Sequence, residues 1–108
     1  MTLYMSQFSY TSEAWATFMK HPEDRSAAVM DLAEKLGCQV RALYYSLGEY
    51  DGIVILDAPN EADVTAFTMA AIAPGHIRAA KTTVLMGAGV MFDAMKKASH
   101  TGYKGLRK

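Results

Sequence analysis

One short stretch constrains the fold more than any other part of the chain. Residues 53–56 read Ile-Val-Ile-Leu and follow a glycine-rich turn, so they predict a strand. Side chains of a strand point alternately to its two faces, and a strand with one wet face alternates apolar and polar residues. This strand is apolar on both faces, so the sheet that contains it needs cover on both sides.

The residues before this strand predict a hairpin. Residues 39–47 form another β-prone run, and residues 48–52 (Gly-Glu-Tyr-Asp-Gly) connect the two runs. Glycines and an Asp-Gly pair between two such runs are typical of a tight antiparallel connection.

A helix is predicted before the hairpin. Val29, Leu32, Ala33 and Leu36 recur at i, i+3, i+4 and i+7, and Gly37 follows as a left-handed cap. We expect this helix to restart at residues 21–24, with proline and acidic residues in its first turn, after a shorter helix at 13–19.

The remaining elements complete an alternating order. Residues 2–10 and 76–86 predict strands, and Asn60 can cap a helix that runs to about residue 73. A last helix, about 88–98, is expected to bury Met91, Phe92 and Met95.

The order β-α-β-β-α-β, followed by a helix, predicts an α+β fold of ferredoxin-like plan, with a four-stranded antiparallel sheet and helices on one face. Those helices leave the second apolar face uncovered. A second copy of the sheet is the simplest cover, so we expect a homodimer or a higher oligomer. We divide the chain into a domain of residues 1–98 and a basic tail of residues 99–108.

Charge argues against partners that recognise a strongly charged protein. Eleven basic and eleven acidic residues cancel, so we expect no nucleic-acid or membrane partner. Five of the basic residues and no acidic residue follow Asp93, which leaves residues 1–93 with about −5. The tail is either a solvated terminus or an arm that contacts an anion or a partner.

Cysteine and histidine usage gives no sign of a metal site or a disulfide. Cys38 is the only cysteine, which fits a reducing compartment, and no signal peptide or membrane-length apolar run is present; we expect a cytoplasmic protein. His21, His76 and His100 are far apart in the sequence. We expect no metal and no cofactor.

Residues 44–60 resemble the signature of the bacterial GYD-domain family. In that family a Gly-x-Tyr-Asp turn joins two strands, as residues 48–51 do here, and an Ala-Pro pair leads into the second helix, as at residues 58–59. Residues 21–25 and 77–82 are similar to further parts of the family pattern. The resemblance covers roughly residues 2–92 and departs from the pattern after Leu85.

Membership implies a ferredoxin-like fold of the dimeric α/β-barrel superfamily. Relatives in that superfamily include cofactor-free monooxygenases, isomerases, dehydratases and small-molecule-sensing domains. The fold does not choose among these functions.

Three residues are catalytic candidates. Tyr50 and Asp51 can be turn residues, or a donor and an acid at the mouth of a pocket. His76 can be a surface histidine, or can share a strand face with Arg78 as an acid–base group.

Five residues are ligand-binding candidates. Arg41 and Arg78 lie in apolar strands, where a charge is costly unless it finds a carboxylate or an anionic ligand. Arg25 has the same two interpretations. Trp15 and Tyr45, like other aromatic residues here, can belong to the core or can line an apolar pocket.

Two functions remain open at this point. The first is a binding protein or a cofactor-independent enzyme for a small, partly apolar, carboxylated molecule. The second is a non-catalytic dimerisation, assembly or regulatory module. For the first we expect a site between helices and sheet near His76 and Arg78, with Tyr50 and Asp51 at the rim.

Overall fold

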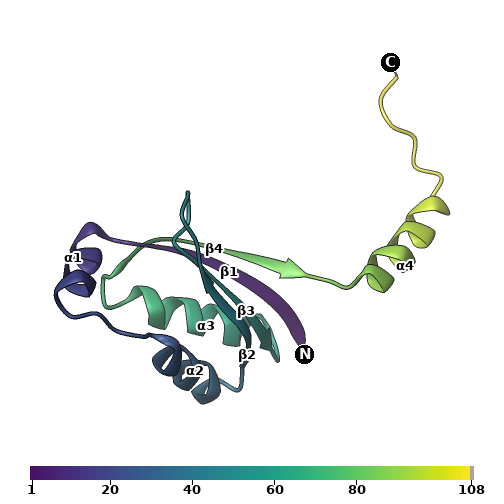
Figure 1. Ribbon diagram of the computed structural model, residues 1–108. Coiled ribbons are helices and arrows are strands. Elements are labelled where there is room, and N and C mark those ends of the chain that lie inside the picture. The colour runs from purple at the N-terminus through teal and green to yellow at the C-terminus, as the bar shows by residue number, and fades with distance from the viewer. Residues whose placement is uncertain (108) are drawn as a thin grey trace.

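Four strands form one antiparallel sheet with the order β2-β3-β1-β4 (Figure 1). The structure is a computed structural model and describes residues 1–107. The elements in chain order are β1 (Thr2–Tyr10), α1 (Ser12–Lys20), α2 (Ser26–Lys35), β2 (Gln39–Tyr45), β3 (Gly52–Ala58), α3 (Glu61–Ile72), β4 (Ile77–Leu85) and α4 (Ala88–Ser99).

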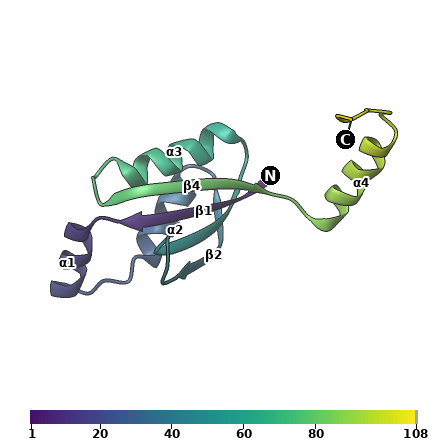
Figure 2. The ribbon, with the colours of Figure 1, turned by 90° about the horizontal axis from the view of Figure 1, so that it is seen from above.

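The helices α1, α2 and α3 lie on one side of the sheet, α1 near one end of it (Figures 1 and 2). This is the βαββαβ plan with a C-terminal helix, so the predicted fold class is confirmed. The sheet and these helices enclose the core. Its central residues are Leu56, Val54, Tyr4, Val64 and Phe67, which are almost completely buried.

Local signals explain three of the helix boundaries. The Thr11 hydroxyl accepts a hydrogen bond from the Ala14 N–H at the start of α1, and the Asn60 side chain accepts one from the Asp63 N–H at the start of α3. Gly37, with φ of 72°, follows the end of α2 as predicted.

The predicted start of α2 was wrong. The helix begins at Ser26, not at residues 21–24, and its first turn holds no acidic residue. Asp24 lies outside the helix and accepts a hydrogen bond from the Ser26 backbone N–H. Because that carboxylate already caps the first turn, residues 22–25 connect the two helices.

The prediction that α4 buries its apolar side chains was also wrong. Met91, Phe92 and Met95 are all exposed, and no residue of α4 is buried. The helix is present at the predicted place in the sequence, but it extends from the end of β4 away from the rest of the chain (Figure 1). A helical pattern predicts an apolar stripe and not the surface that the stripe contacts.

The second sheet face, which we call the open face, has no helix against it. Its apolar residues alternate along the strands with the core residues and are half-buried or exposed. They are Leu3, Met5, Tyr44, Ile53, Ile55 and Leu85. The sheet is therefore apolar on both faces, as residues 53–56 indicate.

Gly52 is the one position in β3 where a side chain has no room. It pairs with Phe8 of β1, and a Cβ on Gly52 would come within 3 Å of three atoms of the Phe8 ring. The bare glycine lets this ring lie directly on the backbone of the neighbouring strand.

We expect Gly52→Ala to lower the free energy of unfolding by about 1–3 kcal/mol, because the added methyl group must displace the ring. Urea denaturation followed by circular dichroism measures this change. Gly87→Ala is the matched control, since Gly87 has an ordinary φ of −72° and open space around it. Equal stabilities of the two variants would contradict the steric argument.

Candidate functional site

The Asp51 carboxylate connects three elements at the hairpin. Its Oδ2 accepts a hydrogen bond from the Tyr10 backbone N–H at 2.8 Å and from Trp15 Nε1 at 3.3 Å. The Asp51 backbone N–H donates to the Phe8 carbonyl at 2.8 Å. The turn is thereby attached to the end of β1 and to the first turn of α1.

Two serines add to this attachment. The hydroxyl of Ser9, which is fully buried, donates to the Glu49 carbonyl at 3.0 Å. The Ser46 hydroxyl donates to the Tyr50 carbonyl at 2.8 Å, and the Ser46 backbone N–H donates to the Asp51 carbonyl. The loop has a defined conformation because each of these donors finds a backbone acceptor.

Tyr10 is the centre of an aromatic cluster. Its ring makes edge-to-face contacts with Phe8, Trp15 and Phe18, with centroids 5.1–5.5 Å apart. Its hydroxyl lies 3.3 Å from the Tyr45 hydroxyl. Burial and, second, this hydrogen bond raise the pKa of Tyr10 well above its ordinary value, so its phenol keeps its proton at alkaline pH, where an ordinary tyrosine ionises.

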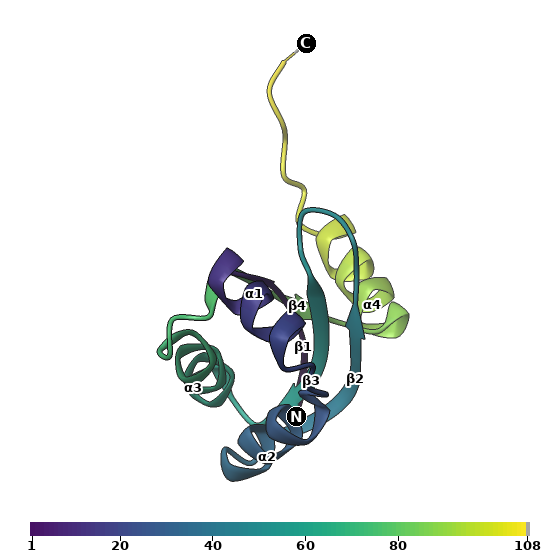
Figure 3. The ribbon, with the colours of Figure 1, turned by 60° about the vertical axis from the view of Figure 1, so that its left-hand side comes forward.

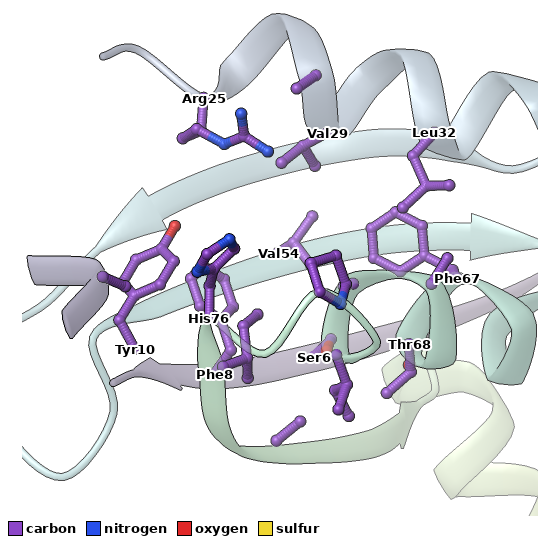
Figure 4. Close-up of a pocket in the computed structure, with 18 of the residues that line it drawn as sticks. Ser6, Phe8, Tyr10, Arg25, Val29, Leu32, Val54, Phe67, Thr68 and His76 are labelled. Atoms are coloured by element: carbon purple, nitrogen blue, oxygen red, sulfur yellow. The ribbon is translucent and has the colours of Figure 1, made fainter. Parts of the chain in front are cut away.

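A cavity of about 430 Å³ lies between the sheet and α1, α2 and α3 (Figure 4). We call it the helix-side cavity. Most of its walls are apolar, including Val29, Leu32, Val54 and Phe67. Its volume is in the range of small-molecule sites.

The polar groups of this cavity are few and unevenly placed. Arg25, Tyr10 and His76 gather at one end, and Leu32 and Phe67 lie at the other (Figure 4). Arg25 Nη1 donates to Glu23 Oε1 at 2.7 Å, which uses one of the five N–H groups of the guanidinium.

Ser6 places a hydroxyl in the middle of the apolar walls. The residue is 5% exposed and lines the cavity. Its hydroxyl is not a buried group left without a partner, because residues 1–107 contain no such side-chain atom. As a cavity-lining group it is open to water or to a polar atom of a ligand.

A second, more open pocket of about 500 Å³ adjoins the first. It is bounded by α1, the hairpin and the segment before α2, and it shares Tyr10, Phe18, Glu23 and Arg25 with the helix-side cavity. We call it the outer pocket. Trp15, Tyr45 and Asp51 line it.

The structure brings five of the eight predicted site residues to these two spaces. His76 and Arg25 line the helix-side cavity, and Arg25, Trp15, Tyr45 and Asp51 line the outer pocket. Trp15 and Tyr45 are 40% and 52% exposed, so neither belongs to the core.

The other three residues line neither space. Tyr50 is half-buried in the turn, where its carbonyl accepts a hydrogen bond. Arg41 pairs with Asp57 across β2 and β3. Of the two partners expected for an arginine in an apolar strand, it therefore has the carboxylate of the same chain. Arg78 is exposed at a register shift, where Ser9 pairs with Ala79 but Tyr10 pairs with Ile77. The shift interrupts the alternation that would have placed Arg78 beside His76.

The sequence reasoning missed Ser6 and Tyr10. A signal for Ser6 was present, because it is a small polar residue between two aromatic ones, Tyr4 and Phe8, on one face of β1. No comparable signal marked Tyr10, since its neighbours come from α1 and β2.

In residues 1–107 no three histidine, cysteine, aspartate or glutamate residues cluster as metal ligands would. The helices of the same residues are too short or too polar to span a lipid bilayer.

Comparison with known proteins supports the fold and the resemblance. The model of the family described as GYD domain matches residues 4–95. None of the curated proteins compared with the chain has a matching sequence.

Among solved structures, MtbAldR is similar over 80% of this chain, with a TM-score of 0.58 and 17% identity. The match covers 53% of MtbAldR, so the chain spans about half its length. FFRP-DM1 matches over 80% of this chain and all of its own, with 19% identity and a TM-score of 0.48. An uncharacterized NIPSNAP domain protein from Burkholderia xenovorans matches over 82% of this chain and 95% of its own, with 15% identity and a TM-score of 0.47. At such identities the first likeness shows the fold alone.

Replacing Asp51 with alanine should destabilise the fold by about 1–3 kcal/mol, because the Tyr10 N–H loses its acceptor in a partly buried place. Urea denaturation followed by circular dichroism measures the loss. Glu49→Ala is the control, since only the backbone carbonyl of Glu49 is used. A loss of similar size in both variants would show that the Asp51 carboxylate has no special part.

Alkaline pH should destabilise the protein through Tyr10. The folded protein holds the Tyr10 proton above pH 10, where an unfolded tyrosine, with a pKa near 10, releases it. The stability from this group is thus complete below pH 10 and is lost as the pH rises further. The free energy of unfolding should fall more steeply above pH 10 in the wild type than in Tyr10→Phe; parallel curves would refute the assignment.

Proposed function

The chain belongs to the GYD-domain family, and we propose that it binds a small, mostly apolar molecule with an anionic end in the helix-side cavity. The observation that carries the proposal is the composition of that cavity. Its walls are mostly apolar, the hydroxyl of Ser6 lies among them, and the Arg25 guanidinium, paired with Glu23, lies at one end.

The apolar walls favour a hydrocarbon or aromatic body for the ligand. Val29, Leu32, Val54 and Phe67 offer no hydrogen bond, and a ligand atom against them is stabilised by leaving water. The Ser6 hydroxyl supports a hydroxyl or carbonyl group partway along this body, because it lines the cavity between apolar side chains.

The polar end favours a carboxylate or a similar anion. Arg25 is held at this end by Glu23 and keeps further N–H groups for a second acceptor. The Tyr10 phenol is neutral at physiological pH, as any tyrosine of ordinary pKa is, and adds no negative charge. The negative charge at this end is that of Glu23, which is paired with Arg25. A ligand carboxylate would accept hydrogen bonds from the guanidinium.

His76 is the candidate for acid–base chemistry in this cavity. Of the three catalytic candidates, it alone lines the same space as Arg25 and Ser6. Its backbone carbonyl accepts a hydrogen bond from the Thr11 N–H at 2.9 Å, which fixes the position of the residue at the cavity end. The proposed function is ligand binding. If the bound molecule is also transformed, His76 is the residue that would transfer a proton.

A second candidate is an assembly or regulatory module made of more than one copy of the chain. The open face supports it, because Met5, Ile53 and Ile55 form an apolar surface without a helix against it. Self-association and ligand binding use opposite faces of the sheet, so the two candidates are compatible.

We place the protein in a reducing compartment, the cytoplasm, on the strength of its one cysteine. Cys38 is buried, and burial, with a smaller contribution from Asp63, raises the pKa of its thiol. A protonated, buried thiol is a poor nucleophile and fits a structural role.

Octanoate and octan-1-ol are suitable probes for the helix-side cavity, since they differ only in the charged end. We expect Arg25→Met to weaken octanoate binding about 10- to 100-fold, because one or more charged hydrogen bonds are lost. Octanol binding should be unchanged. Titration calorimetry measures both.

Arg78→Met is the matched control, because Arg78 is exposed and lines neither space. It should change neither affinity. If Arg78→Met abolished octanoate binding while Arg25→Met did not, or if wild type bound neither probe at millimolar concentration, the proposed ligand class would be wrong.

A further inference from the structure

We infer that residues 86–107, the C-terminal arm, serve to join two copies of the chain: α4 of one copy packs its apolar stripe on the open face of the other. This inference specifies how the self-association described above is built. It rests on four independent properties of the arm and the sheet.

The first is the unpaired apolar stripe of α4. Met91, Phe92 and Met95 recur at i, i+1 and i+4, and Ala88 and Ala98 continue the same side. The three large side chains are 44–60% exposed. An amphipathic helix of 12 residues has little stability in water unless this stripe is packed against something.

The second property is the matching surface on the sheet. Met5 lies between Ile55 of β3 and Thr83 of β4 in the strand register, and all three residues are only half-buried. A 12-residue helix is about 18 Å long, and strands of seven to nine residues are about 23–30 Å long. The stripe is thus shorter than the face that it would cover, and fits within it.

The third property is the direction of the arm. Gly87 is extended, with φ −72° and ψ 163°, so the chain continues outward from β4 and does not turn back over its own sheet. Figure 3 shows α4 on the opposite side of the strands from α1, α2 and α3, which is the side of the open face. The radius of gyration is 17.8 Å, against about 13 Å for a compact domain of this length.

The fourth property is charge. Residues 1–85 hold six basic and ten acidic residues, and residues 86–107 hold four basic and one acidic residue. The body therefore carries −4 and the arm +3. This complementarity favours contact between the arm of one copy and the body of another.

The first test uses a matched pair of substitutions on α4. Met95→Glu places a charge in the stripe, and Val90→Glu makes the same kind of change on the opposite side of the helix, where Val90 is equally exposed. We expect wild type and Val90→Glu to have twice the chain mass of 11.8 kDa by light scattering. For Met95→Glu we expect the dissociation constant of the dimer to rise at least about tenfold.

The second test asks which chain the arm contacts. In a Cys38→Ser background, Met95→Cys is made in one tagged chain and Ile55→Cys in an untagged one; the two are mixed, allowed to exchange and treated with a short bis-maleimide. We expect a covalent dimer of tagged and untagged chains. Val90→Cys in place of Met95→Cys should give little of it.

Three results would overturn the inference. A wild type with the mass of one chain would remove self-association itself. If the dimer were equally stable in Met95→Glu and Val90→Glu, the chain would still self-associate, but through contacts between sheets and not through α4. Cross-linking within one chain, when both cysteines are placed in that chain, would mean that the arm closes on its own sheet. Octanoate titration of Met95→Glu separates all three from the ligand proposal, because the helix-side cavity lies on the other face.

Discussion

The hydrogen bonds to the Asp51 carboxylate determine how the rest of the helix-side architecture is placed. The Tyr10 N–H is at the end of β1, where the strand can no longer pair with β3, and Asp51 supplies the acceptor that the sheet does not. The same oxygen accepts from Trp15, which sets the first turn of α1 against the hairpin. Gly52 follows directly and leaves room for the Phe8 ring. Tyr50 and Asp51 were candidates for an acid–base pair. Asp51 has a structural role, and any catalytic role would have to leave its hydrogen bonds to Tyr10 and Trp15 in place.

The order of the elements along the chain could be predicted because the main elements depend on local patterns. Residues 53–56 required a sheet with two apolar faces, and Asn60 and Gly37 marked a helix start and a helix end. The start of α2 could not be predicted from proline alone, since a capping carboxylate at Asp24 competes with a helical conformation for the same residues. The position of α4 could not be predicted either, because amphipathicity does not identify a partner surface.

The candidate site was predicted in part. Arg25 and His76 line the helix-side cavity, but the alternation argument that joined His76 to Arg78 depended on a regular strand, and the register shifts at this place. A single sequence does not show such a shift. Ser6 and Tyr10 come to the site through pairings between distant segments, which sequence periodicity does not describe.

The sheet separates the two activities proposed for this chain, ligand binding on one face and self-association on the other. On the helix side, α1, α2 and α3 leave a cavity whose polar end is built from Arg25 and His76. On the open side, Met5 and Ile55 need cover and α4 needs a surface. Alternating side chains of the same strands line both sides, so Val54 contacts the cavity while its neighbours Ile53 and Ile55 face the open side. Cover on the open face would hold β3 and β1 in register, and both strands line the cavity, through Val54 and Ser6. Self-association would in this way stabilise the ligand site without contributing a residue to it.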